Sequence, residues 1–276
     1  MHTVTDPGDP RIADFRDLTS ADRRPDLPGG RGLVIAEGVP VVRRLLDSPY
    51  RPRAVLGVAA RLADLDPDLR GLPVPVYATT ADVLARTVGF NLNRGVLASA
   101  DRAPEPALAP LLAAARRLLV LEGVNDHENL GSLFRNAAGL GVDAVLLGPR
   151  CADPLYRRSV RVSMGHVLRV PFVHVPTWAA LRSALAGFTV LALAPHPPSV
   201  PLSTVDPSTP RLALLLGAEG PGLSEEALAA ADGRVRIPMA DGVDSLNVAT
   251  AAAIAIHQLR LPQANRRNDQ ETSLDE

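Results

Sequence analysis

Apolar and polar positions alternate in two blocks along the chain, and each block predicts strands that alternate with helices. In the first block, the short continuous apolar runs GLVIAEG, RAVLGV, VPVYAT and GVLASA are typical of buried strands. After the first run, Val39, Val42, Leu45 and Leu46 follow helical spacing. Residues 31–102 are therefore expected to form a small α/β unit.

The second block repeats this alternation with more strongly apolar strands. RLLVLEGV, DAVLLGP, FTVLALAPH and RLALLLGAEGPG read as strands, and a helix is expected over residues 129–140. Continuous apolar strands that alternate with helices predict a parallel sheet covered on both faces. We therefore expect a second α/β domain over residues 116–262.

Polar and proline-rich stretches flank both blocks. The segment DRAPEPALAP carries three prolines within seven residues, which predicts a linker at 103–115. Asp, Pro, Gly and Arg are frequent in residues 1–30, which are expected to form an N-terminal arm with at most one short helix. The polar residues 263–276 are expected to form a disordered tail.

Composition narrows the range of functions. The formal net charge is −1, so the chain has no overall basic field of the kind that histone-like proteins carry. Cys151 is the one cysteine, which excludes an intramolecular disulfide and a cysteine-rich metal site and fits a cytoplasmic location. The six histidines show no paired ligand spacing, so no metal is expected. No apolar stretch reaches about 18 residues, so no membrane partner is expected.

Four segments that follow predicted strands carry the candidate chemistry, because ligands of open α/β sheets bind beyond the carboxyl ends of the strands. They are 123–135, 191–198, 214–226 and 236–255. The third contains glycines that permit a ligand to approach the backbone closely. Their order differs from that of phosphate-binding and dinucleotide-binding loops, and Glu219 would repel a phosphate. This argues against one alternative, an enzyme that binds a mono- or dinucleotide.

Three motifs occur in order along the second block: NLGSLFRNA at 129–137, LGAEGPGL at 216–223, and IPM followed by SLNVA within 237–249. Together they resemble the motifs of the SpoU/TrmH branch of the SPOUT methyltransferases. The unit at 31–102 is similar to the ribosomal-L30e-like RNA substrate-binding domain that often precedes them. The resemblance implies a parallel-sheet domain with a C-terminal deep trefoil knot, through which the chain forms a homodimer. It also implies transfer of a methyl group from S-adenosyl-L-methionine to a ribose 2′-hydroxyl of tRNA or rRNA.

The same resemblance implies which residues form the active site. Asn129 and Arg135 match the catalytic pair of the first motif, and Glu219 and Asn247 match pocket positions of the second and third. The cofactor is expected to contact strand ends and loops of the second block, at Leu193, Ala194, Gly217, Gly220, Ile237, Met239, Ser245 and Leu246.

The local roles of some of these residues have alternatives. Asn129 and Ser245 also suit the N-cap of a helix, and His127 and Glu128 read as polar loop residues. Arg135 stays protonated in proteins, so we expect it to orient the RNA and to stabilise developing charge rather than to remove a proton.

A basic stretch lies after the first motif. Arg157, Arg158 and Arg161 are its candidate phosphate contacts, and the alternative is a solvated helix face. The alternative function is a non-catalytic RNA-binding protein that retains the SPOUT fold. The complete set of motif residues argues against that alternative.

Overall fold

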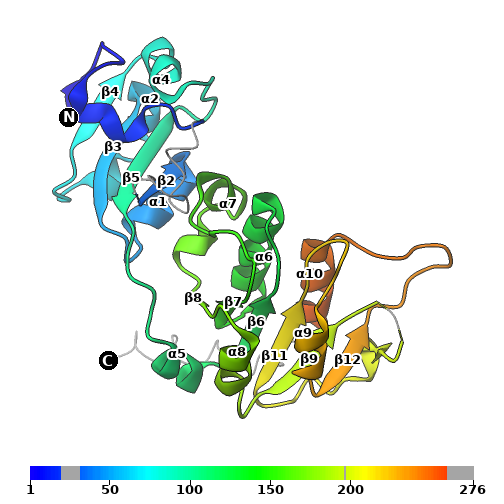
Figure 1. Cartoon of the computed structure of the whole chain (residues 1–276). Coiled ribbons are helices and arrows are strands. Elements are labelled where there is room, and N and C mark those ends of the chain that lie inside the picture. Colours follow the sequence, from blue (N-terminus) through cyan, green and yellow to red (C-terminus); the bar gives the residue numbers. More distant parts are fainter. Residues whose placement is uncertain (20–31, 196, 260–276) are drawn as a thin grey trace, which may run out of the picture.

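The computed structural model describes residues 1–19, 32–195 and 197–259 (Figure 1). Within these ranges the strands form two sheets, one of five strands and one of seven. The tail expected at 263–276 lies outside the described residues, as do residues 20–30 of the expected arm and the end of the domain expected over 116–262.

The first sheet has the strand order β1-β4-β3-β5-β2. Its strands are β1 (His2–Thr3), β2 (Leu33–Glu37), β3 (Pro52–Val58), β4 (Val76–Thr79) and β5 (Val96–Asp101). The helices that accompany it are α1 (Val39–Leu46), α2 (Ala59–Ala63), α3 (Asp66–Leu69) and α4 (Ala81–Val88). Strands β2 to β5 coincide with the four apolar runs of the first block, which confirms the strand pattern read from them.

Residues 1–19 are part of this unit, so the expected arm does not include them. β1 pairs in parallel with β4, and the 3-10 helix η1 (Pro10–Phe15) buries Ile12 and Phe15 completely. With Val4 and Leu18 these side chains join the core that covers one face of the sheet. The sequence allowed one short helix in this stretch, and η1 is that helix. The irregular spacing of the buried side chains among polar residues carries no strand or helix period, so their burial against the sheet was not predicted.

The linker expected at 103–115 contains a helix, α5 (Leu108–Ala114), which follows β5 in the chain (Figure 1). Pro110 is the third residue of this helix. Because the first backbone N–H groups of a helix have no intrahelical partner, a proline there costs no helical hydrogen bond.

The second sheet has the order β10-β12-β9-β11-β6-β7-β8, and all its neighbouring strands pair in parallel. Its strands are β6 (Arg117–Leu121), β7 (Ala144–Leu147), β8 (Phe172–His174), β9 (Thr189–Leu193), β10 (Val200–Pro201), β11 (Leu212–Leu216) and β12 (Gly233–Arg236). The parallel α/β sheet predicted from the continuous apolar runs is confirmed.

Helices cover both faces of this sheet, because its strands are apolar on both sides. The helical segments are α6 (His127–Leu140), α7 (Arg157–Val162), η3 (His166–Leu168), α8 (Trp178–Ala184), η4 (Leu202–Thr204), α9 (Glu225–Ala229) and α10 (Val248–Leu259). Leu119 and Leu121 of β6 share a core with α6, α7 and α10, whereas Leu118 and Val120 share a core with α5, α8 and α9. Alternate residues of one strand therefore face opposite layers. No helix in the described ranges is long and apolar enough to cross a membrane.

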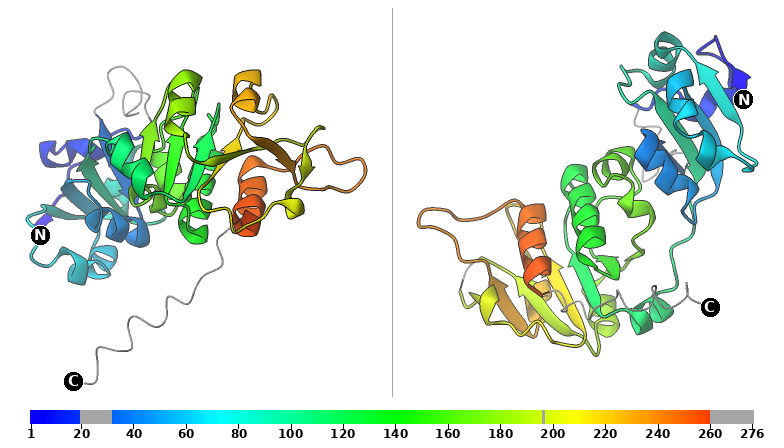
Figure 2. Two further views of the ribbon diagram at one scale, coloured as in Figure 1. Left: turned by 90° about the horizontal axis from the view of Figure 1, so that it is seen from below. Right: turned by 180° about the vertical axis from the view of Figure 1, so that it is seen from behind.

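The two units pack against each other through α1 and β2 on one side and α7 and η3 on the other (Figure 2). Val41 and Leu45 of α1 belong to the same buried cluster as Val160 of α7 and Val167 of η3. The segment between β12 and α10 projects from the opposite end of the second unit (Figure 2).

Candidate functional site

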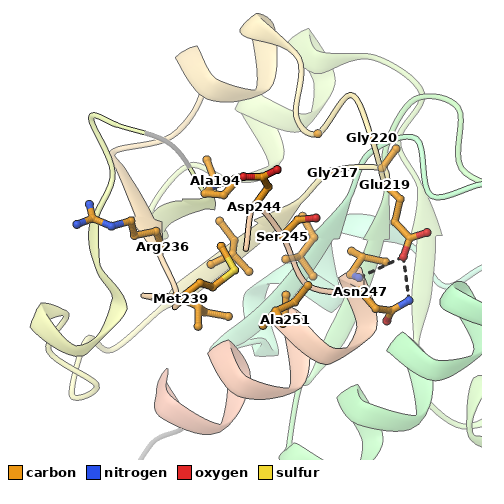
Figure 3. Close-up of a pocket in the computed structure, with 18 residues that line it drawn as sticks. Ala194, Gly217, Glu219, Gly220, Arg236, Met239, Asp244, Ser245, Asn247 and Ala251 are labelled. Carbon is orange, nitrogen blue, oxygen red and sulfur yellow. Dashed lines mark hydrogen bonds between the residues drawn. The ribbon is translucent and has the colours of Figure 1, made fainter. Parts of the chain in front are cut away.

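A pocket of about 620 Å³ opens at the carboxyl ends of β9, β11 and β12, at the base of the projecting segment (Figure 3). This is the edge of a parallel sheet where ligands of such folds bind. Its lining includes all eight residues expected to contact the cofactor: Leu193, Ala194, Gly217, Gly220, Ile237, Met239, Ser245 and Leu246. Segments separated by more than 50 residues in the chain therefore meet around one cavity.

The glycine-rich loop after β11 forms one wall of the pocket. The Gly222 N–H donates to the Ala218 carbonyl (3.1 Å), so the loop folds back on itself. A Cβ atom on Gly217 would lie 2.2 Å from the Gly222 carbonyl carbon, and Gly220 and Gly222 have φ angles of +87° and +71°. Glycine is required at Gly217 by this close approach and at the other two by backbone conformation.

Three of the four expected catalytic residues meet at one side of the pocket. Asn247 Nδ2 donates to Asn129 Oδ1 and to Glu219 Oε1, each at 2.8 Å. Figure 3 shows the Glu219 carboxylate directed at Asn247 and the start of α10. Residues from α6, the glycine-rich loop and the entry to α10 thus form one hydrogen-bonded network.

Asn247 also caps α10, so the interpretation of Ser245 as the N-cap was wrong. Asn247 Oδ1 accepts from the backbone N–H groups of Ala249 (2.9 Å) and Thr250 (3.2 Å). The cap uses the amide oxygen and leaves both amide hydrogens for the network, which fixes the orientation of the amide group. A serine side chain at this position would offer one hydrogen, so Asn is the residue type that can hold all four contacts.

Helix α6 begins two residues earlier than expected. Asp126 is its N-cap and accepts from the N–H groups of Glu128 (2.9 Å) and Asn129 (2.8 Å). His127 and Glu128 are therefore in the first helical turn and not in a loop, and Asn129 is not the cap. Since Asp126 takes the capping role, the Asn129 side chain is left to reach Asn247.

The fourth expected catalytic residue, Arg135, lies on another side of α6. It follows Asn129 by six positions, which is a rotation of about 120° around the helix axis. Asn136 lies on the Asn129 side, and its Nδ2 donates to the Ala249 carbonyl of α10 (2.8 Å). Arg135 is exposed, and its charge acts on His166 of η3, whose pKa is lowered by burial and also by nearby arginines. Within a single chain, Arg135 therefore does not reach the hydrogen-bonded network of Asn129.

Comparisons with known proteins decide the family. The sequence model of the SpoU rRNA Methylase family matches residues 116–257. The chain belongs to the SpoU rRNA methylase family. A Mycobacterium tuberculosis protein named an uncharacterized tRNA/rRNA methyltransferase is 59% identical over 262 residues, which cover 94% of this chain and 91% of that protein.

Two further proteins are similar to this chain, one over about half of its sequence and the other over most of its structure. A 23S rRNA guanosine 2′-O-methyltransferase of Bacillus subtilis, named RlmP, is 34% identical over 151 residues, which cover 54% of this chain and 60% of that protein. The crystal structure of an AdoMet-bound rRNA methyltransferase from Sinorhizobium meliloti superposes with a TM-score of 0.78 at 25% identity. That superposition covers 93% of this chain and 96% of the Sinorhizobium chain.

The pocket suits the methyl-donor cofactor of the family. Its volume is in the usual range for cavities that enclose small molecules. Ile237, Met239 and Leu246 give apolar surface for a purine ring, and the strand-end backbone of Leu193 offers hydrogen-bonding groups for its edge. Asp244 adds a carboxylate, which suits a ligand that carries positive charge.

The basic stretch differs from its expected role in part. Arg157 is only 19% exposed, lies 3.1 Å from Glu37 of the first unit, and stacks over the Phe90 ring at 4.6 Å. Arg158 pairs with Glu128 at 2.6 Å. Arg161 is half-buried. Arg157 therefore joins the two units, because acidic and aromatic partners distant in sequence reach it.

Some lining residues were not predicted from the sequence. Pro195, Ala218, Arg236, Asp244 and Ala251 also line the pocket. Each lies within five residues of a predicted cofactor residue, inside the segments 191–198, 214–226 and 236–255. The strand-end rule would have found them if it had been applied to every neighbouring position.

Proposed function

We infer that this chain is an S-adenosylmethionine-dependent methyltransferase that modifies a ribose 2′-hydroxyl of tRNA or rRNA. The network of Asn129, Glu219 and Asn247 at the mouth of a cofactor-sized pocket is the observation that carries this function. A protein that only bound RNA would have no need for this polar network beside such a pocket. The names of the relatives support RNA as the substrate class.

The residues of this chain divide the work of the reaction. S-adenosylmethionine, when bound, supplies an electrophilic methyl group. The strand ends and the glycine-rich loop would hold it, and the network would fix the position of the attacking ribose. Asn129 Oδ1 is occupied by Asn247, so the amide hydrogens of Asn129 are left to donate to the RNA. In this division, Asn129 contacts the substrate, while Glu219 and Asn247 hold the Asn129 side chain in place.

Arg135 would reach the site from a second copy of the chain. In its own chain it lies about 120° around α6 from Asn129. A two-fold dimer through the knotted domain would bring the partner's α6 to the network, where a guanidinium can bind the adjacent phosphate and stabilise developing charge on the ribose oxygen. The homodimer and the trefoil knot are proposals supported by family membership.

The first unit is proposed to be an L30e-like RNA-binding domain, extended at its N-terminus by residues 1–19. We divide the chain into this unit up to 102, a linker at 103–115 that includes α5, and the methyltransferase domain from 116. Arg158 and Arg161 remain candidate phosphate contacts on α7. A cytoplasmic location follows from the proposed RNA substrate.

Deletion of the gene tests this function in the cell. Nucleotides that carry a 2′-O-methyl group resist alkaline cleavage, so their positions can be mapped across total tRNA and rRNA. We expect at least one position to lose its methyl group, the wild-type gene to restore it, and an Asn247→Asp gene to restore it much less completely. An unchanged map would contradict the proposed function.

A further inference from the structure

Glu122 is a buried carboxylate that has no part in the proposed chemistry. It follows β6 directly and is 2% exposed. Its Oε1 accepts from the Trp178 indole N–H and from the Ser224 hydroxyl, each at 2.8 Å. Its Oε2 accepts from the Ser224 backbone N–H at 2.8 Å. Arg150, which is 72% exposed, places Nη2 3.5 Å from Oε1.

Glu122 contacts both ends of the glycine-rich loop. Its backbone N–H donates to the carbonyl of Leu216 (2.9 Å), the last residue of β11 before the loop. Its side chain binds the backbone and the hydroxyl of Ser224, the N-cap of α9, directly after the loop. The residue directly after β6 therefore fixes the points where the loop 217–223 leaves the sheet and re-enters regular structure.

The loop between these ends needs to be held in one conformation. It has two glycines at positive φ and closes on itself at Gly217 and Gly222. It also carries Glu219, whose carboxylate must lie 2.8 Å from the Asn247 amide. A shift of about 1 Å at either end would open the pocket wall and break that hydrogen bond.

We propose that Glu122 is a positioning residue that holds the glycine-rich loop in its cofactor-binding conformation. The inference rests on the proposed function of the pocket and adds a residue to it. A carboxylate suits this place because it accepts from several donors at once, and hydrogen bonds to a charged acceptor are stronger than those to a neutral one. Arg150 and the three N–H and O–H donors offset the cost of burying the charge.

Glu122→Gln separates this role from general support of the fold. An amide keeps the shape of the side chain but has one acceptor oxygen, so its NH₂ group must face either Ser224 N–H or the Trp178 indole N–H, which are both donors. Trp178→Phe is the matched control, because it removes a hydrogen bond to the same carboxylate from α8 and leaves both loop ends attached.

The experiment measures the dissociation constant for S-adenosylmethionine by calorimetry and the melting temperature of wild type, Glu122→Gln and Trp178→Phe. We expect Glu122→Gln to weaken binding at least tenfold, which corresponds to about 1.4 kcal/mol. The dissociation constant of Trp178→Phe should lie within about twofold of that of wild type. Its melting temperature should fall about as much as that of Glu122→Gln. Hydrogen exchange of the amides 217–224 should become faster in Glu122→Gln alone.

Each outcome has a distinct meaning. Wild-type affinity in Glu122→Gln overturns the inference, as does equal weakening in both variants, which would assign Glu122 to the stability of the fold. If Glu122→Gln does not fold, Ser224→Ala replaces it, since it removes the hydroxyl that donates to Glu122 and caps α9, and keeps the backbone contact to Glu122. That variant should lose affinity severalfold, and unchanged affinity would overturn the inference. Failure of the wild type to bind S-adenosylmethionine would instead refute the proposed function.

Discussion

Asn247→Asp is the substitution that best isolates the polar network from the stability of α10. Aspartate caps helices as well as asparagine does, so the contacts to the N–H groups of Ala249 and Thr250 should remain. The two amide donors are lost, and a carboxylate oxygen comes to lie where Nδ2 now stands, 2.8 Å from Glu219 Oε1. The change therefore turns an attraction into a repulsion without removing the cap.

The expected magnitude follows from these contacts. Two unit charges 2.8 Å apart repel by about 1.5 kcal/mol even at the dielectric constant of water. The lost hydrogen bond to the Glu219 carboxylate is worth about 1.5 kcal/mol or more. A total of about 3 kcal/mol corresponds to roughly a 100-fold fall in kcat/KM.

The assay measures initial rates with labelled S-adenosylmethionine and RNA, with the melting temperature of each variant beside it. Asn247→Ser is the matched control, because serine also caps a helix but adds no charge. We expect it to fall between wild type and Asn247→Asp, by roughly tenfold. The reasoning is refuted if Asn247→Asp keeps a third or more of wild-type activity. It is also refuted if the melting temperature of Asn247→Asp falls so far that unfolding accounts for the lost activity.

Three other predictions test separate parts of the account. Gly217→Ala should abolish cofactor binding in calorimetry, because its Cβ would overlap Gly222. Its control, Gly139→Ala on the open side of α6, should bind the cofactor normally and have a slightly higher melting temperature. Dimers mixed from Arg135→Ala and Asn247→Asp chains should recover up to half of wild-type activity if the site is shared between protomers, and none if each chain supplies its own Arg135. Burial raises the pKa of Cys151 to about 11, so the thiol stays protonated at pH 8. It should react with iodoacetamide far more slowly than free cysteine, and the rate should rise only as the pH approaches that pKa. Fast reaction at pH 8 would contradict this prediction.

The sequence predicted those features that depend on local pattern. The apolar runs around Leu119 and Leu214 are short and continuous, which favours strands buried on both faces and therefore a parallel sheet. The strand-end rule and the motifs predicted the segments that line the pocket. The spacing of glycines and polar residues in those segments reflects contacts made within a few residues, such as the turn that joins Gly217 to Gly222.

Features that depend on partners distant in sequence could not be predicted in this way. Arg157 was expected to contact phosphate or solvent, because its partners Glu37 and Phe90 are remote from it in the chain. Glu122 gave no signal, since its partner Ser224 lies about 100 residues later. The capping roles of Asp126 and Asn247 were missed because neighbouring polar residues compete for the same position, and only the fold decides between them.

Ribose methylation by the purified chain tests the central claim most directly. RNA from the deletion strain would be incubated with the protein and S-adenosylmethionine that carries a labelled methyl group, then digested to nucleosides and analysed by mass spectrometry. We predict label in a 2′-O-methylated nucleoside of tRNA or rRNA, at the position lost on deletion, and an initial rate of labelling roughly 100-fold lower with Asn247→Asp. Label on a base, or no label in RNA from a protein that binds the cofactor, would contradict the account.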